Sequence, residues 1–214
     1  MKPTNDTPTA ESVAFPRWLA TAIVLLMGAG YTLLDALQPS ELIYTILSFI
    51  IGLLSFTVII LARLHLDVTE SYLIPRRLSL RGGIALVVVA VCLLPILLST
   101  SGKVGWHWIP ALVYAPASGI AQELYFRASL LPAMEGLLQK RSFAAIGLHS
   151  LVFVAFHLRT FLSIGPNPIV AVVAIVLFVA GFAWGYQVQR DRTIVWAVAL
   201  HSTFLVVMSM FKWG

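Results

Sequence analysis

The polar residues that could take part in proton transfer lie within apolar stretches of the sequence: Gln122, Glu123, Arg127, His149, His157 and His201. Ionisable groups in membrane helices usually face the interior of a bundle and mark a functional site. Glu123 and Arg127 are four residues apart, which places them on one helix face and predicts an ion pair. Carboxylates and imidazoles are the side chains that most often transfer protons in general acid–base catalysis. We therefore predict one shared polar site, although each histidine by itself would be a common packing residue.

The composition predicts an all-α, polytopic integral membrane protein. Hydrophobic residues make up 59% of the 214 residues and charged residues only 11%, against about 45–50% and 25% in soluble domains. These proportions exclude a soluble enzyme and a disordered chain. A membrane helix needs about 20 mostly apolar residues, and we expect about seven, at Trp18–Leu34, Leu42–Ala62, Gly82–Thr100, Ile109–Met134, Ser142–Leu158, Ile169–Gln187 and Ile194–Phe211.

The loops predict the orientation of this helical bundle. Most lysine and arginine residues lie in the loops that share a side with the N-terminus, so we expect a cytoplasmic N-terminus and an outside C-terminus. The inner ends of the spans carry Trp18, Trp184 and Trp196, as in an interfacial aromatic belt. Topology thus explains the net charge of +5, and we expect a bacterial plasma membrane protein with no nucleic-acid partner. We divide the chain into a cytoplasmic tail (1–17), N-terminal transmembrane helices (18–104) and a catalytic core (105–214).

The polar residues of the core form three short motifs in a fixed order. Residues 122–127 read QELYFR, residues 153–157 read FVAFH, and a third motif begins at His201 and has Leu205 four residues later. In this order and on separate spans, the motifs resemble those of the CPBP family of intramembrane proteases. This family of CAAX-processing and bacteriocin-processing (Abi) proteases has EExxxR, FxxxH and a histidine followed four residues later by Asn. The first Glu and the Asn are replaced here.

The resemblance implies a helical-bundle endopeptidase that hydrolyses a peptide bond of a membrane-anchored peptide or protein, in or near the bilayer. It implies that the catalytic positions are occupied by Gln122 (the position of the base), Glu123, Arg127, His157 and His201. In the family, the first Glu activates water, the histidines position water or substrate or stabilise the oxyanion, and the Asn adds a hydrogen-bond donor. A glutamine can orient water but cannot take its proton near neutral pH. We therefore expect a slow or inactive protease whose Gln122, His157 and His201 converge on a pocket open to the cytoplasmic half of the bilayer.

Three other interpretations of the polar residues stay open. The chain could be a catalytically impaired or engineered-inactive relative that binds membrane peptides or partner proteins. It could also be a small transporter built around Glu123, Arg127 and the histidines. We favour no cofactor, but zinc remains an alternative, because two histidines and a carboxylate (His157, His201 and Glu123) form a known zinc set. The HExxH motif of zinc proteases is absent from the sequence.

Overall fold

The computed structural model describes residues 17–37, 40–66, 72, 79–88, 91, 109–138 and 142–210. All the regular structure within these ranges is helical: α1 (Arg17–Leu37), α2 (Glu41–Leu66), η1 (Pro110–Tyr114), α4 (Ala115–Tyr125), η2 (Phe126–Leu130), α5 (Leu131–Leu137), α6 (Ser142–Phe156), α7 (Leu158–Ile164), α8 (Ile169–Asp191) and α9 (Val195–Met210), with a further helix at residues 80–88. The predicted all-α class is therefore confirmed. The predicted tail before Arg17 and most of the third span after residue 88 lie outside the described residues.

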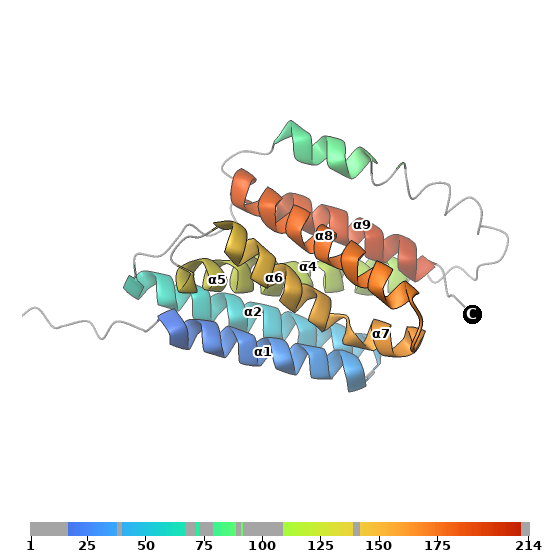
Figure 1. Ribbon diagram of the computed structural model, residues 1–214, viewed down its shortest axis with the longest axis horizontal. Coiled ribbons are helices and arrows are strands. Elements are labelled where there is room, and N and C mark those ends of the chain that lie inside the picture. Colours follow the sequence, from blue (N-terminus) through green and yellow to red (C-terminus); the bar gives the residue numbers. More distant parts are fainter. Residues whose placement is uncertain are drawn as a thin grey trace, which may run out of the picture.

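Helix α4 occupies the middle of the bundle and carries the QELYFR motif. Helices α1 and α2 pack on one side of it, whereas α8 and α9 lie on the other side (Figure 1). The contact with α2 is close at Gly52, where an added Cβ atom would lie 2.8 Å from the carbonyl oxygen of Ala121. The N-terminal helices thus pack directly against the predicted catalytic core. The boundary that we set at residue 104 stays a prediction.

Three of the described helices are long and apolar enough to cross a membrane: α1, α2 and α8. Helices α6 and α7 would supply a fourth span as a bent pair. The predicted fourth span, Ile109–Met134, corresponds to the consecutive segments η1, α4, η2 and α5, and the seventh corresponds to α9. The polytopic membrane architecture is confirmed, and the total of seven spans stays a prediction.

The two π-helical turns on either side of α4 can be traced to prolines. Each π turn contains the residue four positions before a proline: Leu112 in η1 precedes Pro116, and Ala128 in η2 precedes Pro132. A proline ring clashes with the carbonyl group four residues earlier and cannot donate a hydrogen bond to it. A widened turn relieves that clash. In η2, the Ser129 hydroxyl also donates to the Leu124 carbonyl oxygen, five residues earlier, at 2.7 Å.

The bend between α6 and α7 occurs at His157. The two helices differ in direction by 48°, and the His157 backbone leaves the helical conformation, with φ −86° and ψ 21°. Its Nδ1 atom lies 2.8 Å from the carbonyl oxygen of Phe153, so the imidazole occupies an acceptor that a continuing α-helix would use. The chain then continues through Ile164, which confirms that this region extends beyond Leu158.

The glycines of the GFAWG segment in α8 allow a close approach of α6. An added Cβ atom at Gly181 would lie 3.1 Å from Phe153, and one at Gly185 would lie 3.1 Å from Ile146. Small residues four apart commonly allow such contacts between membrane helices. This contact brings α8 against the face of α6 that carries His149 and Phe153.

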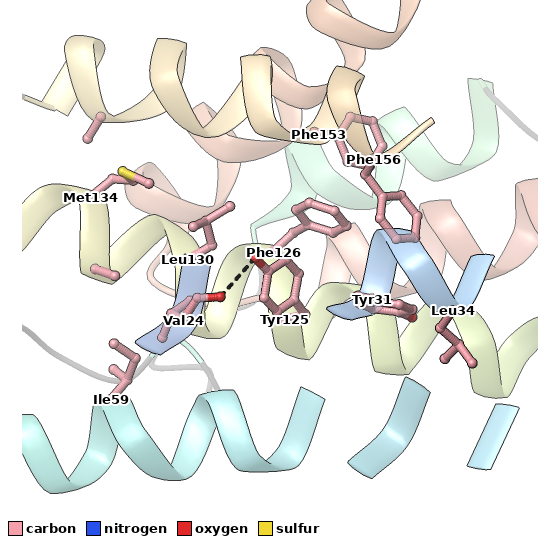
Figure 2. Close-up of a cluster of buried hydrophobic side chains, with 12 residues drawn as sticks. Val24, Tyr31, Leu34, Ile59, Tyr125, Phe126, Leu130, Met134, Phe153 and Phe156 are labelled. Carbon is pink, nitrogen blue, oxygen red and sulfur yellow. Dashed lines mark hydrogen bonds between the residues drawn. The ribbon is translucent and has the colours of Figure 1, made fainter. Parts of the chain in front are cut away.

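A hydrophobic cluster joins α1, α4 and α6 beside the polar motifs. Figure 2 shows its aromatic members, among which the ring centroids of Phe126 lie 5.0 Å from Phe153 and 5.2 Å from Phe156. The Tyr125 hydroxyl donates to the Val24 carbonyl oxygen at 3.2 Å, which ties α4 to α1 (Figure 2). Edge-to-face aromatic contacts of this kind fix ring orientations. They therefore hold Phe153, at one end of the cluster, against the polar site described next.

Candidate active site

Glu123 is the centre of the buried polar site. Its Oε1 atom lies 2.8 Å from Nη1 of Arg127 and 2.7 Å from Nδ1 of His201. Glu123 and Arg127 are completely buried, and His201 is only 4% exposed. The predicted Glu123–Arg127 pair is therefore confirmed. The structure adds a histidine from α9, so that one carboxylate oxygen joins two helices.

Aromatic rings surround the guanidinium group of Arg127. Its Cζ atom lies 4.7 Å from the ring centroid of Phe153, 5.2 Å from that of Trp184 and 5.6 Å from that of Phe126. Cations within about 6 Å of an aromatic face are stabilised by the ring quadrupole. Arg127 is thus in contact with one carboxylate and three aromatic rings.

The position of Trp184 corrects the sequence analysis, which assigned this residue to the interfacial aromatic belt. Its ring centroid lies 5.3 Å from that of His201, and it also faces Arg127. The reason is helical geometry: Trp184 lies between Gly181 and Gly185 on the stretch of α8 that packs closely on α6. The side chain of Trp184 is therefore directed toward Arg127 and His201.

His157 approaches the same site from the bend between α6 and α7. Its ring centroid lies 4.7 Å from that of Phe153, whose centroid is 6.4 Å from that of His201. Both histidines therefore border one phenylalanine ring. Nδ1 of His157 is bonded to the backbone carbonyl oxygen of Phe153. A carbonyl oxygen can only accept, so in the neutral ring Nδ1 carries the proton and Nε2 has the free lone pair.

Gln122, next to Glu123 in sequence, has a different neighbour. Its Nε2 atom donates to the Ser118 hydroxyl one turn earlier on α4, at 3.2 Å, and its side chain is 6% exposed. This bond uses one N–H of the amide, so the carbonyl oxygen and the second N–H of Gln122 are left to bind water or substrate. Whether Gln122 converges on one pocket with His157 and His201 stays a prediction.

A cavity of about 760 Å³ lies next to Ser118, the hydrogen-bond partner of Gln122. Its lining includes Ser118, Leu205, which lies four residues after His201, and Arg159, which lies two residues after His157. The cavity lies where α1 ends and α2 begins, because Asp35 and Glu41 also line it. In the orientation that we predicted, this end faces outside, whereas we expected the pocket to open to the cytoplasmic half. Gln122, His157 and His201 do not line this cavity, so the pocket that we expect them to share stays a prediction.

The alternative zinc set is not assembled in the structure. Within the described ranges, no group of three or more His, Cys, Asp and Glu side chains is arranged to hold a metal ion. Glu123 and His201 contact each other through Oε1 and Nδ1, and Nδ1 of His157 is bonded to a backbone carbonyl oxygen. These three side chains are therefore engaged in hydrogen bonds and are not arranged around one metal position.

The site contains residues that the motifs did not single out. Ser118 holds Gln122, and Trp184 contacts both Arg127 and His201. Ser118 could have been found because it lies four residues before Gln122 on one helix. Trp184 could not, because its contacts depend on how α8 packs.

Comparison with known families agrees with the resemblance seen in the motifs. Residues 103–207 match the family described as Type II CAAX prenyl endopeptidase Rce1-like, and this range includes QELYFR, FVAFH and His201. Comparisons with curated proteins and with solved structures gave no significant match. The matched residues are about half of the chain and contain the whole buried polar site. Over residues 103–207, the chain is similar to the Rce1-like, type II CAAX prenyl endopeptidase family, in agreement with its predicted CPBP resemblance.

Proposed function

We propose that this chain is an intramembrane endopeptidase that hydrolyses a peptide bond of a membrane-anchored peptide or protein. At the family level, the match over residues 103–207 supports a CAAX-type endopeptidase. The chemistry that we assign to individual residues goes beyond that match. We also propose a bacterial plasma membrane and a cytoplasmic N-terminus.

The observation that carries the proposal is the 2.7 Å contact between Oε1 of Glu123 and Nδ1 of His201. An ionised carboxylate can only accept hydrogen bonds, so Nδ1 of His201 carries the proton. In the neutral ring, Nε2 is then the basic nitrogen. A carboxylate that holds a histidine in this tautomer, and stabilises the imidazolium formed later, is the arrangement by which histidine acts as a general base in other hydrolases.

In the proposed reaction, His201 replaces the carboxylate that is missing at residue 122. Nε2 of His201 takes a proton from a water molecule as the water oxygen attacks the carbonyl carbon of the peptide. The same proton passes to the amine nitrogen when the carbon–nitrogen bond breaks, which returns His201 to its neutral form. Gln122 orients the water through its carbonyl oxygen, and His157 positions the substrate. The steps use side chains alone.

Cleavage of a panel of membrane-anchored peptides in liposomes tests the proposal, with products identified by mass spectrometry. We expect slow cleavage by the unmodified chain and a fall in kcat of about 10²–10⁴-fold in His201→Gln, because general acid–base catalysis contributes about that much. His65→Gln, outside the matched residues, is the control and should keep the activity. Cleavage that is unchanged in His201→Gln would exclude His201 as the base.

A non-catalytic relative that binds membrane peptides is the second candidate function. It is favoured by the amide at residue 122, which cannot take a proton, and by Leu205, which offers no donor to an oxyanion. In this case every peptide of the panel would stay intact, whereas a photo-crosslinking peptide would label residues that line the cavity at Ser118 and Leu205. The two readouts separate the candidates.

A further inference from the structure

His149 is a buried histidine that the proposed reaction does not use. Its side chain is completely inaccessible, and neither ring nitrogen has a hydrogen-bond partner among the described residues. A neutral imidazole has one donor and one acceptor, and buried polar groups nearly always bond to protein or to ordered water. His149 therefore needs a partner that can serve a donor, an acceptor or both.

Other polar atoms of the same region are in the same situation. Nε and Nη2 of Arg127 and Oε2 of Glu123 are buried and have no partner within the described part of the chain. Arg127 and His149 both border the ring of Phe126, whose centroid is 5.6 Å from Cζ of Arg127 and 6.1 Å from the centroid of His149. The region thus contains unpaired N–H donors on Arg127, an unpaired acceptor oxygen on Glu123, and one donor and one acceptor nitrogen on His149.

Helix α8 packs closely beside His149. An added Cβ atom at Gly185 would lie 3.6 Å from Nδ1 of His149 and 3.1 Å from Ile146, the second distance being tighter than ordinary contact. The glycine therefore places no side-chain atom against the imidazole.

We propose that His149 and Arg127 bind internal water next to Glu123, and that His149 is a positioning residue of the Glu123–Arg127–His201 site. Water both donates and accepts, so it can serve the unpaired atoms of all three side chains, as buried water does in other proteins. A neutral ligand fits this mixture of donors and acceptors better than an ion does. Bound water fixes the guanidinium group of Arg127 and through it the carboxylate that holds His201.

The hydration itself does not depend on the proposed function, and it is tested directly by solid-state NMR. The sequence has 5 histidines, so the chain labelled with ¹⁵N-histidine in liposomes gives few ring signals, and the signals lost in His149→Gln are those of His149. We expect transfer of magnetisation from water protons to both His149 nitrogens. If the other histidines show such transfer and His149 shows none, the proposal is wrong.

Thermal stability gives a second test, with His149→Leu and His149→Gln as a matched pair of similar size. An unpaired buried imidazole would be destabilising, so its replacement by leucine would raise Tm. If His149 binds water together with Arg127, replacement by leucine leaves that water short of hydrogen-bond partners and lowers Tm. Glutamine has a donor and an acceptor, so His149→Gln should keep most of the thermal stability. A higher Tm in His149→Leu would contradict the proposal. The same replacements at His65 are the control.

The positioning role of His149 rests on the proposed function and is read from kinetics. We expect His149→Leu to lower kcat by up to about a hundredfold through misplacement of Glu123, with KM unchanged and with recovery in His149→Gln. An unchanged kcat per folded molecule would overturn the positioning role while leaving the endopeptidase in place. If the parent chain cleaves nothing, the proposed function fails, and the NMR and Tm results still decide whether His149 binds water.

Discussion

Removal of both partners of the buried ion pair should destabilise the protein much less than the two single removals added together. In Glu123→Leu, the completely buried guanidinium group of Arg127 loses the carboxylate that neutralises it. In Arg127→Met, Glu123 keeps its bond to His201. An uncompensated buried charge costs about 3–5 kcal/mol, so we expect Glu123→Leu near the upper end of this range and Arg127→Met near the lower end.

The double variant Glu123→Leu/Arg127→Met contains neither charge. Its main loss is the acceptor for Nδ1 of His201, which costs about 1–3 kcal/mol for one unsatisfied buried group. The free energy of unfolding should therefore fall by much less in the double variant than in the two single variants added together. This difference is the signature of a pair that is held together by mutual neutralisation.

Unfolding free energies are measured by steric trapping in bicelles, for the wild type and the three variants. A matched control is the pair Arg159 and Asp35, which is 3.8 Å apart and has side chains 44% and 23% exposed. Its coupling energy should stay within about 0–1 kcal/mol, as for other exposed pairs. If the double variant at Glu123 and Arg127 were as unstable as the sum of its single variants, mutual neutralisation would be the wrong explanation.

Three further predictions concern activity and topology. Gln122→Glu together with Leu205→Asn should raise the cleavage rate more than either change alone, since the two changes restore a titratable base and a hydrogen-bond donor for the oxyanion. Equal rates in the two single variants and the double variant would contradict the assignment of these residues to the family's motif positions. Chelation by EDTA should leave cleavage unchanged, because the proposed steps use side chains alone, and a loss that zinc restores would revive the metal alternative. Reporter fusions after Gly214 should signal from outside, and a cytoplasmic signal would reverse the predicted orientation.

The sequence was sufficient to predict the helical class and the ion pair between Glu123 and Arg127. Long apolar stretches form α-helices in lipid, because an α-helix satisfies all of its backbone polar groups internally. The pair follows from local geometry, since residues four apart on a helix are neighbours wherever that helix packs. For the same reason, the predicted ranges 18–34, 42–62, 142–158 and 169–187 lie close to helices α1, α2, α6 and α8.

The C-terminal end of α6 was harder to predict from sequence. His157 ends this helix because its imidazole uses the carbonyl oxygen of Phe153, and helix propensity contains no information about that choice. The sequence suggested only that the chain could extend beyond Leu158. The bend, and with it the direction from which His157 meets Phe153, is a result of the folded structure.

Only the tertiary structure decided which groups share the carboxylate of Glu123. His201 is 78 residues away in sequence, and its contact with Glu123 depends on the packing of α9 against α4. The placement of Trp184 on Arg127 depends in the same way on the glycines of α8. Apolar helices all favour burial in lipid and in one another, so hydrophobicity determines that they form but not which faces meet. Those faces are selected by small residues, which permit close approach, and by polar groups, which need partners in the bundle.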